Sequence, residues 1–177
     1  MTRLALLARR GDDAALTGFV QRSQADVWRL AAHLVDRASA DDLTQEVYLR
    51  AMPALARYRG DAPARLWLLT IARRVCADEL RKRIRRRARI GAVGTLDGIE
   101  VPIVDATALV DLSGLVADLD DDRRAAFVLT QVLGLSYAEA AAVSGVPIGT
   151  IRSRVARARG DLLRAADGDG VASSGHP

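Results

Sequence analysis

Apolar residues recur along the chain with the spacing of helices. Between residues 12 and 35, and again in later stretches, they lie three and four positions apart, and no run alternates like a strand. Alanine and leucine are abundant over long stretches in which glycine and proline are scarce, which also favours helix. The helical patterns fall into two blocks, residues 1–90 and residues 109–166. The sequence therefore predicts an all-α protein with two small helical domains.

Start and stop signals divide the first block. The stretch "SADD", which begins at Ser39, resembles a capping box at the start of a helix. Pro53 and the stretch "YRGDAP" (residues 58–63) interrupt the helical pattern as turns do. A long helix is then expected from about Ala64 towards Arg86.

Two segments lack helical periodicity. Residues 91–108 contain three glycines, a proline and scattered acids, so we expect a flexible acidic linker that joins the two domains. Residues 167–177, "DGDGVASSGHP", show no apolar periodicity and are expected to form a disordered tail.

The second block contains the pattern of a helix-turn-helix. Ser136 and Glu139 have the spacing of a capping box, which predicts a short helix through about Val143. Gly145 suits a tight turn, and Pro147 suits the first position of the helix that follows. Two helices joined by a short turn with glycine are typical of a helix-turn-helix.

The second of these helices has an apolar face and a basic face. Its apolar stripe, which should pack on the preceding helices, consists of Ile148, Ile151, Val155 and Leu162. The outward face consists of Thr150, Ser153, Arg154 and Arg157, with Arg152 and Arg159 on its flanks. Short polar and guanidinium groups suit the major groove of DNA, where arginine binds guanine edges or phosphates. A solvated basic face on an ordinary helical hairpin is the alternative, and the helix-turn-helix spacing favours DNA binding.

Residues 40–51, "ADDLTQEVYLRA", predict a helix with an acidic outer face. The inward face should consist of Leu43, Val47, Tyr48 and Ala51. The outward face should consist of Asp42, Gln45, Glu46 and Leu49. Acids around an exposed leucine suit a protein partner with basic residues and would repel DNA. A solvated acidic helix face is the alternative.

Residues 58–87 combine a loop with a basic amphipathic helix. The apolar side of the helix should consist of Leu68, Ile71, Ala72, Val75 and Trp67. Another side should consist of Arg74, Asp78, Arg81, Lys82 and Arg85, and the preceding loop offers Tyr58, Arg59 and Asp61. Basic groups beside aromatic rings suit separated or single-stranded DNA, whose bases stack or enter pockets. The run "RKRIRRR" alone would indicate only a generic nucleic-acid or localisation patch.

The charge of the chain is unevenly distributed. The formal net charge is +4, but residues 72–90 carry nine basic side chains against two acids, a local +7. Residues 91–122 carry eight acids and no base, a local −8, and residues 148–164 return to +4. Basic segments of this kind are typical of surfaces that meet a polyanion.

Other features argue against several classes of protein. We expect neither a membrane span nor a signal peptide, because the apolar stretches fall short of roughly 18 residues and the N-terminal stretch lacks a cleavage site. Cys76 is expected to be a core residue, and His33 and His176 supply neither a metal-ligand set nor a catalytic setting. No cofactor and no enzymatic activity are expected.

Three motifs in this order resemble the bacterial RNA polymerase sigma factors of the extracytoplasmic-function (ECF) subfamily. "DDLTQEVYLRA" resembles the polymerase-binding helix of sigma region 2, and "LWLLTIARRVCADELR" resembles its promoter-melting helix. "LTQVLGLSYAEAAAVSGVPIGTIRSRVARAR" resembles the helix-turn-helix of sigma region 4. The resemblance covers about residues 11–166. It implies a cytoplasmic transcription initiation factor that binds core RNA polymerase and promoter DNA. The alternative function is a helix-turn-helix transcription regulator that acts without polymerase core.

The resemblance also implies roles for individual residues. The clamp helices of the largest polymerase subunit would meet Asp42, Gln45, Glu46 and Leu49. The minus-ten element would meet Tyr58, Arg59, Asp61, Trp67, Arg74, Asp78, Arg81 and Lys82, and the minus-thirty-five element would meet Thr150, Arg152, Ser153, Arg154 and Arg157. Many members have asparagine where this chain has Arg74, which leaves the base preference there open. Members are commonly held inactive by an anti-sigma factor, so such a protein is a candidate partner.

Overall fold

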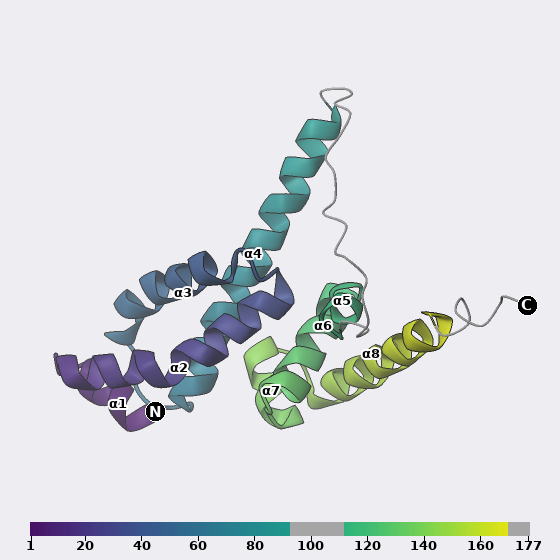
Figure 1. Cartoon of the computed structure of the whole chain (residues 1–177). Helices are drawn as coiled ribbons and strands as arrows, with labels where there is room; N and C mark the ends of the chain where they lie inside the picture. The colour runs from purple at the N-terminus through teal and green to yellow at the C-terminus, as the bar shows by residue number, and fades with distance from the viewer. Residues whose placement is uncertain (93–111, 170–177) are drawn as a thin grey trace, which may run out of the picture.

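The computed structural model describes residues 1–92 and 112–169, and these residues are helical with no strand among them (Figure 1). The elements of the first half are α1 (Thr2–Ala8), α2 (Asp13–Leu34), α3 (Ala40–Leu55) and α4 (Ala64–Ala92). Those of the second half are α5 (Leu112–Ala117), α6 (Asp121–Phe127), the π-helical turn η1 (Val128–Val132), α7 (Tyr137–Ser144) and α8 (Ile148–Asp169). The all-α prediction with a helical half on each side of residues 93–111 is confirmed.

The first half packs around α2. This helix begins where the apolar period predicts, and the side chain of Asp12 caps it by accepting a hydrogen bond from the amide of Ala15 at 2.8 Å. Its inner face buries Phe19, Val27 and Leu30 completely. The inner faces of α1, α3 and α4 close around these side chains, so that the outer faces of α3 and α4 are left for other partners.

Two local predictions for the first half are wrong. Pro53 does not interrupt the helix but lies inside α3, near its end, where the missing amide costs only one hydrogen bond of the last turn. Ser39 does precede α3, but its hydroxyl does not cap the helix. It accepts a hydrogen bond from Arg83 of α4 at 2.6 Å instead, so a long-range contact replaces the local one.

The helix-turn-helix forms in the second half. Ser136 and Glu139 make both hydrogen bonds of the predicted capping box at the start of α7. Gly145 ends α7 with φ of +68°, a left-handed conformation that glycine adopts without steric cost. Pro147 stands one residue before α8 rather than inside it, and its carbonyl accepts from the amide of Thr150 at 3.0 Å.

Both long basic helices extend further than expected. α4 ends at Ala92 rather than near residue 86, and α8 continues to Asp169, three residues into the segment predicted as tail. Most of the predicted linker, and the tail from residue 170, lie outside the described residues.

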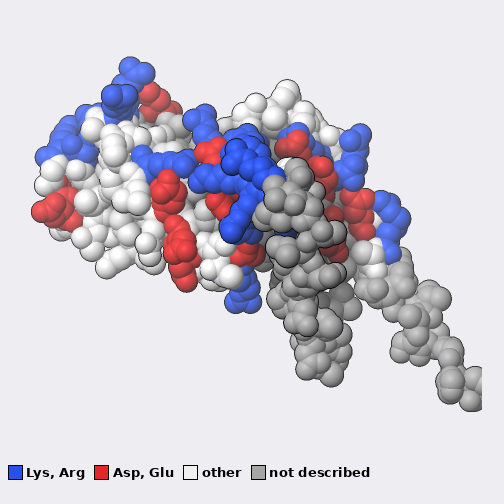
Figure 2. All heavy atoms as spheres, turned by 90° about the horizontal axis from the view of Figure 1, so that it is seen from above, with Lys and Arg blue, Asp and Glu red and all other residues white. Residues whose placement is uncertain are grey.

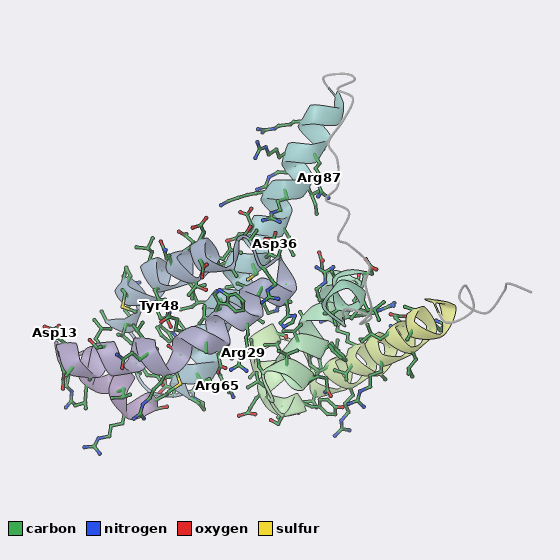
Figure 3. All side chains as sticks on the ribbon, in the orientation of Figure 1. Asp13, Arg29, Asp36, Tyr48, Arg65 and Arg87 are labelled. Carbon is green, nitrogen blue, oxygen red and sulfur yellow. The ribbon has the colours of Figure 1, made fainter. Side chains whose placement is uncertain are left out.

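The two halves pack directly against each other. α4 contacts α7, and α2 contacts η1, α5 and α6, so the buried cores of the two halves are continuous. Two arginines cross the junction: Arg65 donates to the carbonyl of Leu133 at 2.7 Å, and Arg124 donates to the carbonyl of Leu34 at 3.1 Å. Figure 3 shows Arg65 where the first half meets the second. We call this arrangement, in which α2 and α4 of the first half pack against the second half, the closed arrangement.

Candidate polymerase-binding and DNA-binding surfaces

The outer face of α3 carries an acidic patch around an exposed leucine. The four residues of this α3 patch are those predicted from the sequence: Asp42, Gln45, Glu46 and Leu49. Leu49 has 69% of its surface exposed, the largest exposed fraction among the large apolar side chains of the described residues. Glu46 is half-buried and forms an ion pair with Arg50 at 2.7 Å.

The α3 patch stands on a firmly held helix. Leu43, Val47 and Ala51 are buried against the core, as the period predicts. The hydroxyl of Tyr48 shares a 2.7 Å hydrogen bond with the buried hydroxyl of Ser23, and burial raises the pKa of Tyr48 above its ordinary value. The patch therefore has a fixed shape that a partner can recognise.

A basic face runs along α4 beside the α3 patch. Arg74, Arg81 and Lys82 are exposed there, as predicted. Asp78 accepts from Arg81 at 2.6 Å and from Arg50 at 2.9 Å, and these two hydrogen bonds lower the pKa of Asp78. Asp78 is thus held as a carboxylate between two guanidinium groups.

The far end of α4 is more basic still and has no packing partner among the described residues. Its exposed arginines are Arg85, Arg86, Arg87 and Arg89. Figure 1 shows this end of α4 projecting from the body, and Figure 2, seen from above, shows basic side chains gathered around it. The charge count of residues 72–90 could have identified this arm, although no residue of α4 beyond Lys82 was predicted as a DNA contact.

The loop between α3 and α4 presents two charged side chains outward. Arg59 and Asp61 have 81% and 78% of their side chains exposed and lie 3.4 Å apart. Tyr58, by contrast, is buried: its ring packs on Trp67 with centroids 5.1 Å apart, and its hydroxyl donates to the carbonyl of Ala62. Tyr58 was predicted as a DNA contact, and here its ring is not at the surface.

A pocket of about 470 Å³ opens beside this loop. Its lining residues are Arg50, Pro53, Ala54, Arg57, Tyr58 and Trp67. Aromatic edges between two guanidinium groups suit a nucleobase and the phosphates next to it. Arg50 and Arg57 were not predicted from the sequence, because they come from α3 and from the residues after it and reach the pocket only in the folded chain.

The outward face of α8 carries the predicted recognition residues. Arg152, Ser153 and Arg157 are exposed, and Thr150 is half-buried. On the inner face Ile151 and Val155 are fully buried, as expected, whereas Ile148 is exposed rather than packed.

Arg154 departs from the prediction. Its side chain is only 21% exposed, because it folds back to form an ion pair with Asp122 at the start of α6. In this conformation Arg154 is not free to reach a base or a phosphate.

Other chemistry has little support in the described residues. Cys76 is fully buried, and burial raises the pKa of its thiol to about 12, so it is a core residue as predicted. In residues 1–92 and 112–169 no group of His, Cys, Asp and Glu side chains is arranged to hold a metal ion. None of the helices in these ranges has the length and apolar character that crossing a membrane requires.

The fold and these surfaces define the class of protein: a helical DNA-binding protein with a basic helix in one half and a helix-turn-helix in the other. Residues 19–86 match the family Sigma-70 region 2, and residues 109–162 match Sigma-70, region 4. The ECF RNA polymerase sigma factor SigC of Mycobacterium tuberculosis is 51% identical over 172 residues, which are 96% of this chain and 92% of the relative. The chain belongs to the ECF RNA polymerase sigma factors.

Solved structures agree with this assignment. CnrH in complex with the cytosolic domain of CnrY is 27% identical and superposes with a TM-score of 0.73, covering 95% of this chain and 97% of that one. The sigma factor RpoE in complex with the anti-sigma factor NepR from Bartonella quintana is 26% identical with a TM-score of 0.71, covering 86% and 96%. The chain is thus an alternative sigma factor for promoter recognition and not an enzyme, and a regulator that acts without polymerase is not favoured.

Proposed function

We propose that the α3 patch binds core RNA polymerase, at the clamp helices of the largest subunit. The observation that carries this proposal is Leu49, a large apolar side chain that is exposed on the same face of α3 as Asp42 and Glu46. A partner helix with an apolar position flanked by basic residues would bury Leu49 and neutralise Asp42 and Glu46. Apolar anchors with a charged rim are typical of specific protein interfaces.

We propose that the loop, the pocket and the basic face of α4 bind the non-template strand of the minus-ten element. Arg59 and Asp61 would meet bases, and a base would enter the pocket beside Trp67. Arg74, Arg81 and Lys82 would follow the strand along α4. Asp78, which lies between Arg50 and Arg81, would hold these two guanidinium groups in place to contact the phosphates of the DNA strand.

The outward face of α8 would read the minus-thirty-five element as duplex. Arg152, Ser153 and Arg157 are exposed and available for the major groove, with Thr150 beside them. Arg154 would have to leave Asp122 before it contacts DNA. Affinity would come largely from phosphate contacts and specificity from a few base contacts.

Promoter binding would require the two halves to separate. The two elements lie about 25 base pairs apart by their names, which is about 85 Å of duplex at 3.4 Å per base pair. Helix α4 belongs to the surface proposed for the minus-ten element, and α7 belongs to the helix-turn-helix proposed for the minus-thirty-five element. These two helices are in direct contact in this conformation. We therefore interpret the closed arrangement as the free form and an opened arrangement as the promoter-bound form.

We also propose an anti-sigma factor as a partner. The support is that one of the similar solved structures is a complex of the sigma factor RpoE with the anti-sigma factor NepR, and that another, CnrH, is also bound to a protein partner, the cytosolic domain of CnrY. The protein would act in the cytoplasm, where core polymerase is found.

Co-purification with core polymerase tests the first of these proposals. Asp42→Arg with Glu46→Arg should abolish core binding, because it reverses the charge of the α3 patch. Asp13→Arg with Asp118→Arg is the matched control: it makes the same change in net charge at two exposed acids, one at the start of α2 and one in the turn after α5. Both variants should keep the helical circular dichroism spectrum, since none of the four substituted side chains belongs to the buried core. Equal core binding by the two double variants would refute the assignment of the α3 patch.

A further inference from the structure

Helix α1 lies outside the residues that match sigma region 2, yet it is fixed to the body of the protein. The match begins at residue 19, whereas α1 spans Thr2–Ala8. Ala5 is fully buried in the core, and the side chain of Leu4 packs against Gly18 of α2. α1 is therefore a rigid support rather than a loose N-terminal extension.

Two side chains of α1 and that of Arg9, the residue that directly follows it, contact the loop that leads into α4. At the start of the loop, Arg9 donates a hydrogen bond to the carbonyl of Tyr58 at 2.8 Å. In the middle, Leu6 covers Gly60, with its methyl groups 3.5 Å from the position that a Cβ would take. At the end, the amide of Ala64 donates to the hydroxyl of Thr2 at 3.1 Å. The three contacts hold the loop near its beginning, in its middle and where it enters α4.

The loop needs such support because it has few contacts of its own. Backbone hydrogen bonds from Arg57 and Tyr58 tie its first residues to the end of α3, and beyond them the described bonds within it are that from the Tyr58 hydroxyl to Ala62 and the exposed ion pair of Arg59 and Asp61. Gly60 adopts φ of +87°, a conformation that glycine reaches without steric cost. Glycine also has more conformational freedom than other residues, so ordering the loop at this position costs more entropy. The amide of Ala64 is one of the first-turn donors of α4 that have no partner within the helix, and Thr2 supplies one from 62 residues away.

The contacts from α1 act on the backbone of the loop and leave its charged side chains free. Arg9 and Thr2 bind a carbonyl and an amide, and Leu6 packs on a residue without a side chain. Arg59 and Asp61 point into solvent. A backbone held in this way presents these two side chains in one preformed arrangement.

We infer that α1 is a positioning element for promoter recognition: through Thr2, Leu6 and Arg9 it fixes the conformation of the loop and so sets the discrimination between bases in the minus-ten element. The inference rests on the proposed function of the loop as a reader of that element. Side chains that are already held in their binding conformation discriminate between bases better than mobile ones, because they lose little conformational entropy when they contact the correct base.

Two neighbouring arginines allow a matched test. Arg9 and Arg10 carry the same charge, but only Arg9 is seen to contact the loop among the described residues. The measurement is binding of holoenzyme to fork-junction DNA whose non-template strand is randomised across the minus-ten element, with sequencing of the bound pool. Arg9→Ala should lower the preference for the selected base by about 3- to 10-fold, the range expected for one lost hydrogen bond. Arg10→Ala should leave the preference unchanged.

A salt series separates positioning from direct contact with DNA. If Arg9 touched a phosphate, Arg9→Ala would flatten the dependence of binding on salt, because one fewer counterion would be released. As a positioning residue, Arg9 should change the base preference while the salt slope and the affinity for core polymerase stay the same. A flattened slope with an unchanged base preference would overturn the inference.

The hydroxyl of Thr2 offers a second test that does not change charge. Thr2→Val removes the hydroxyl but keeps the shape and should weaken base discrimination, and Thr2→Ser should restore it. If Val and Ser behave alike, Thr2 does not act through its hydrogen bond to Ala64 and the inference fails. Arg59→Ala with Asp61→Ala tests the proposed function itself: unchanged discrimination in that variant would show that the loop does not read the element, independently of α1.

Discussion

Removing the guanidinium of Arg65 should open the closed arrangement of the two halves. Arg65 makes two contacts of 2.7 Å, one within the first half to Asp26 and one across the junction to the carbonyl of Leu133. Arg65→Ala removes both, but Asp26 keeps its ion pair with Arg29. The first half should therefore remain folded while the junction loses the hydrogen bond from Arg65 to Leu133.

The size of the effect follows from the geometry of the junction. A hydrogen bond from a charged donor contributes about 1.5–3 kcal/mol, and the lower end applies because 35% of the Arg65 side chain is exposed to water. About 1.4 kcal/mol corresponds to a tenfold change in an equilibrium constant. The ratio of closed to open molecules should thus fall about tenfold in Arg65→Ala. The bond from Arg124 to Leu34 and the apolar contacts of α4 with α7 should keep part of the population closed.

Energy transfer between two dyes measures this ratio. Gln24→Cys and Ala156→Cys place exposed labelling sites on α2 and α8. The native Cys76 should not react, since it is buried and its pKa of about 12 keeps the thiol protonated. Arg29→Ala in the same labelled protein is the control, because it also removes an ion pair of Asp26 but no bond across the junction.

Two outcomes would refute this reasoning. If Arg65→Ala and Arg29→Ala open the protein equally, the effect comes from Asp26 and not from the bond to Leu133. If neither opens it, the hydrogen bond does not hold the halves together. A salt series on the wild type separates charge from packing: closure held by charge alone would be lost at high salt, whereas direct packing should keep the transfer efficiency high.

Two further predictions concern ion pairs within each half. Asp122→Ala should release Arg154 and tighten binding of the minus-thirty-five duplex, whereas Arg154→Ala should weaken it; equal affinities in a titration at moderate salt would exclude Arg154 from the interface. Burial alone would raise the pKa of Asp36, but hydrogen bonds from Arg83 and Ser39 lower it overall. The ionised Asp36 therefore stabilises the fold above the pKa that it has in the unfolded chain, and this stabilisation is lost as pH falls through its lower pKa in the folded protein. Urea unfolding between about pH 6 and pH 3 should show a smaller decline for Asp36→Asn than for wild type; identical declines would contradict this.

Local patterns in the sequence were sufficient for much of this protein. The positions of α2 and α7, the capping box of Ser136 and Glu139, and the turn at Gly145 each depend on interactions within a few residues of the chain. The same holds for the exposed face of α3 that carries Leu49, because the helical period alone decides which side of a helix faces the core. The resemblance to ECF sigma factors rests on these short motifs and their order.

Contacts between distant residues were decided only by the tertiary structure. Arg154 has the sequence position of a DNA contact, but Asp122 lies 32 residues away and binds it. Ser39 has the position of a helix cap, but Arg83 takes its hydroxyl. The support that α1 gives to the loop through Arg9 and Tyr58, and the closure of the two halves through Arg65, join segments 49 and 68 residues apart. No local pattern encodes such pairs, because they depend on how whole helices pack and which side chains then come within hydrogen-bonding distance.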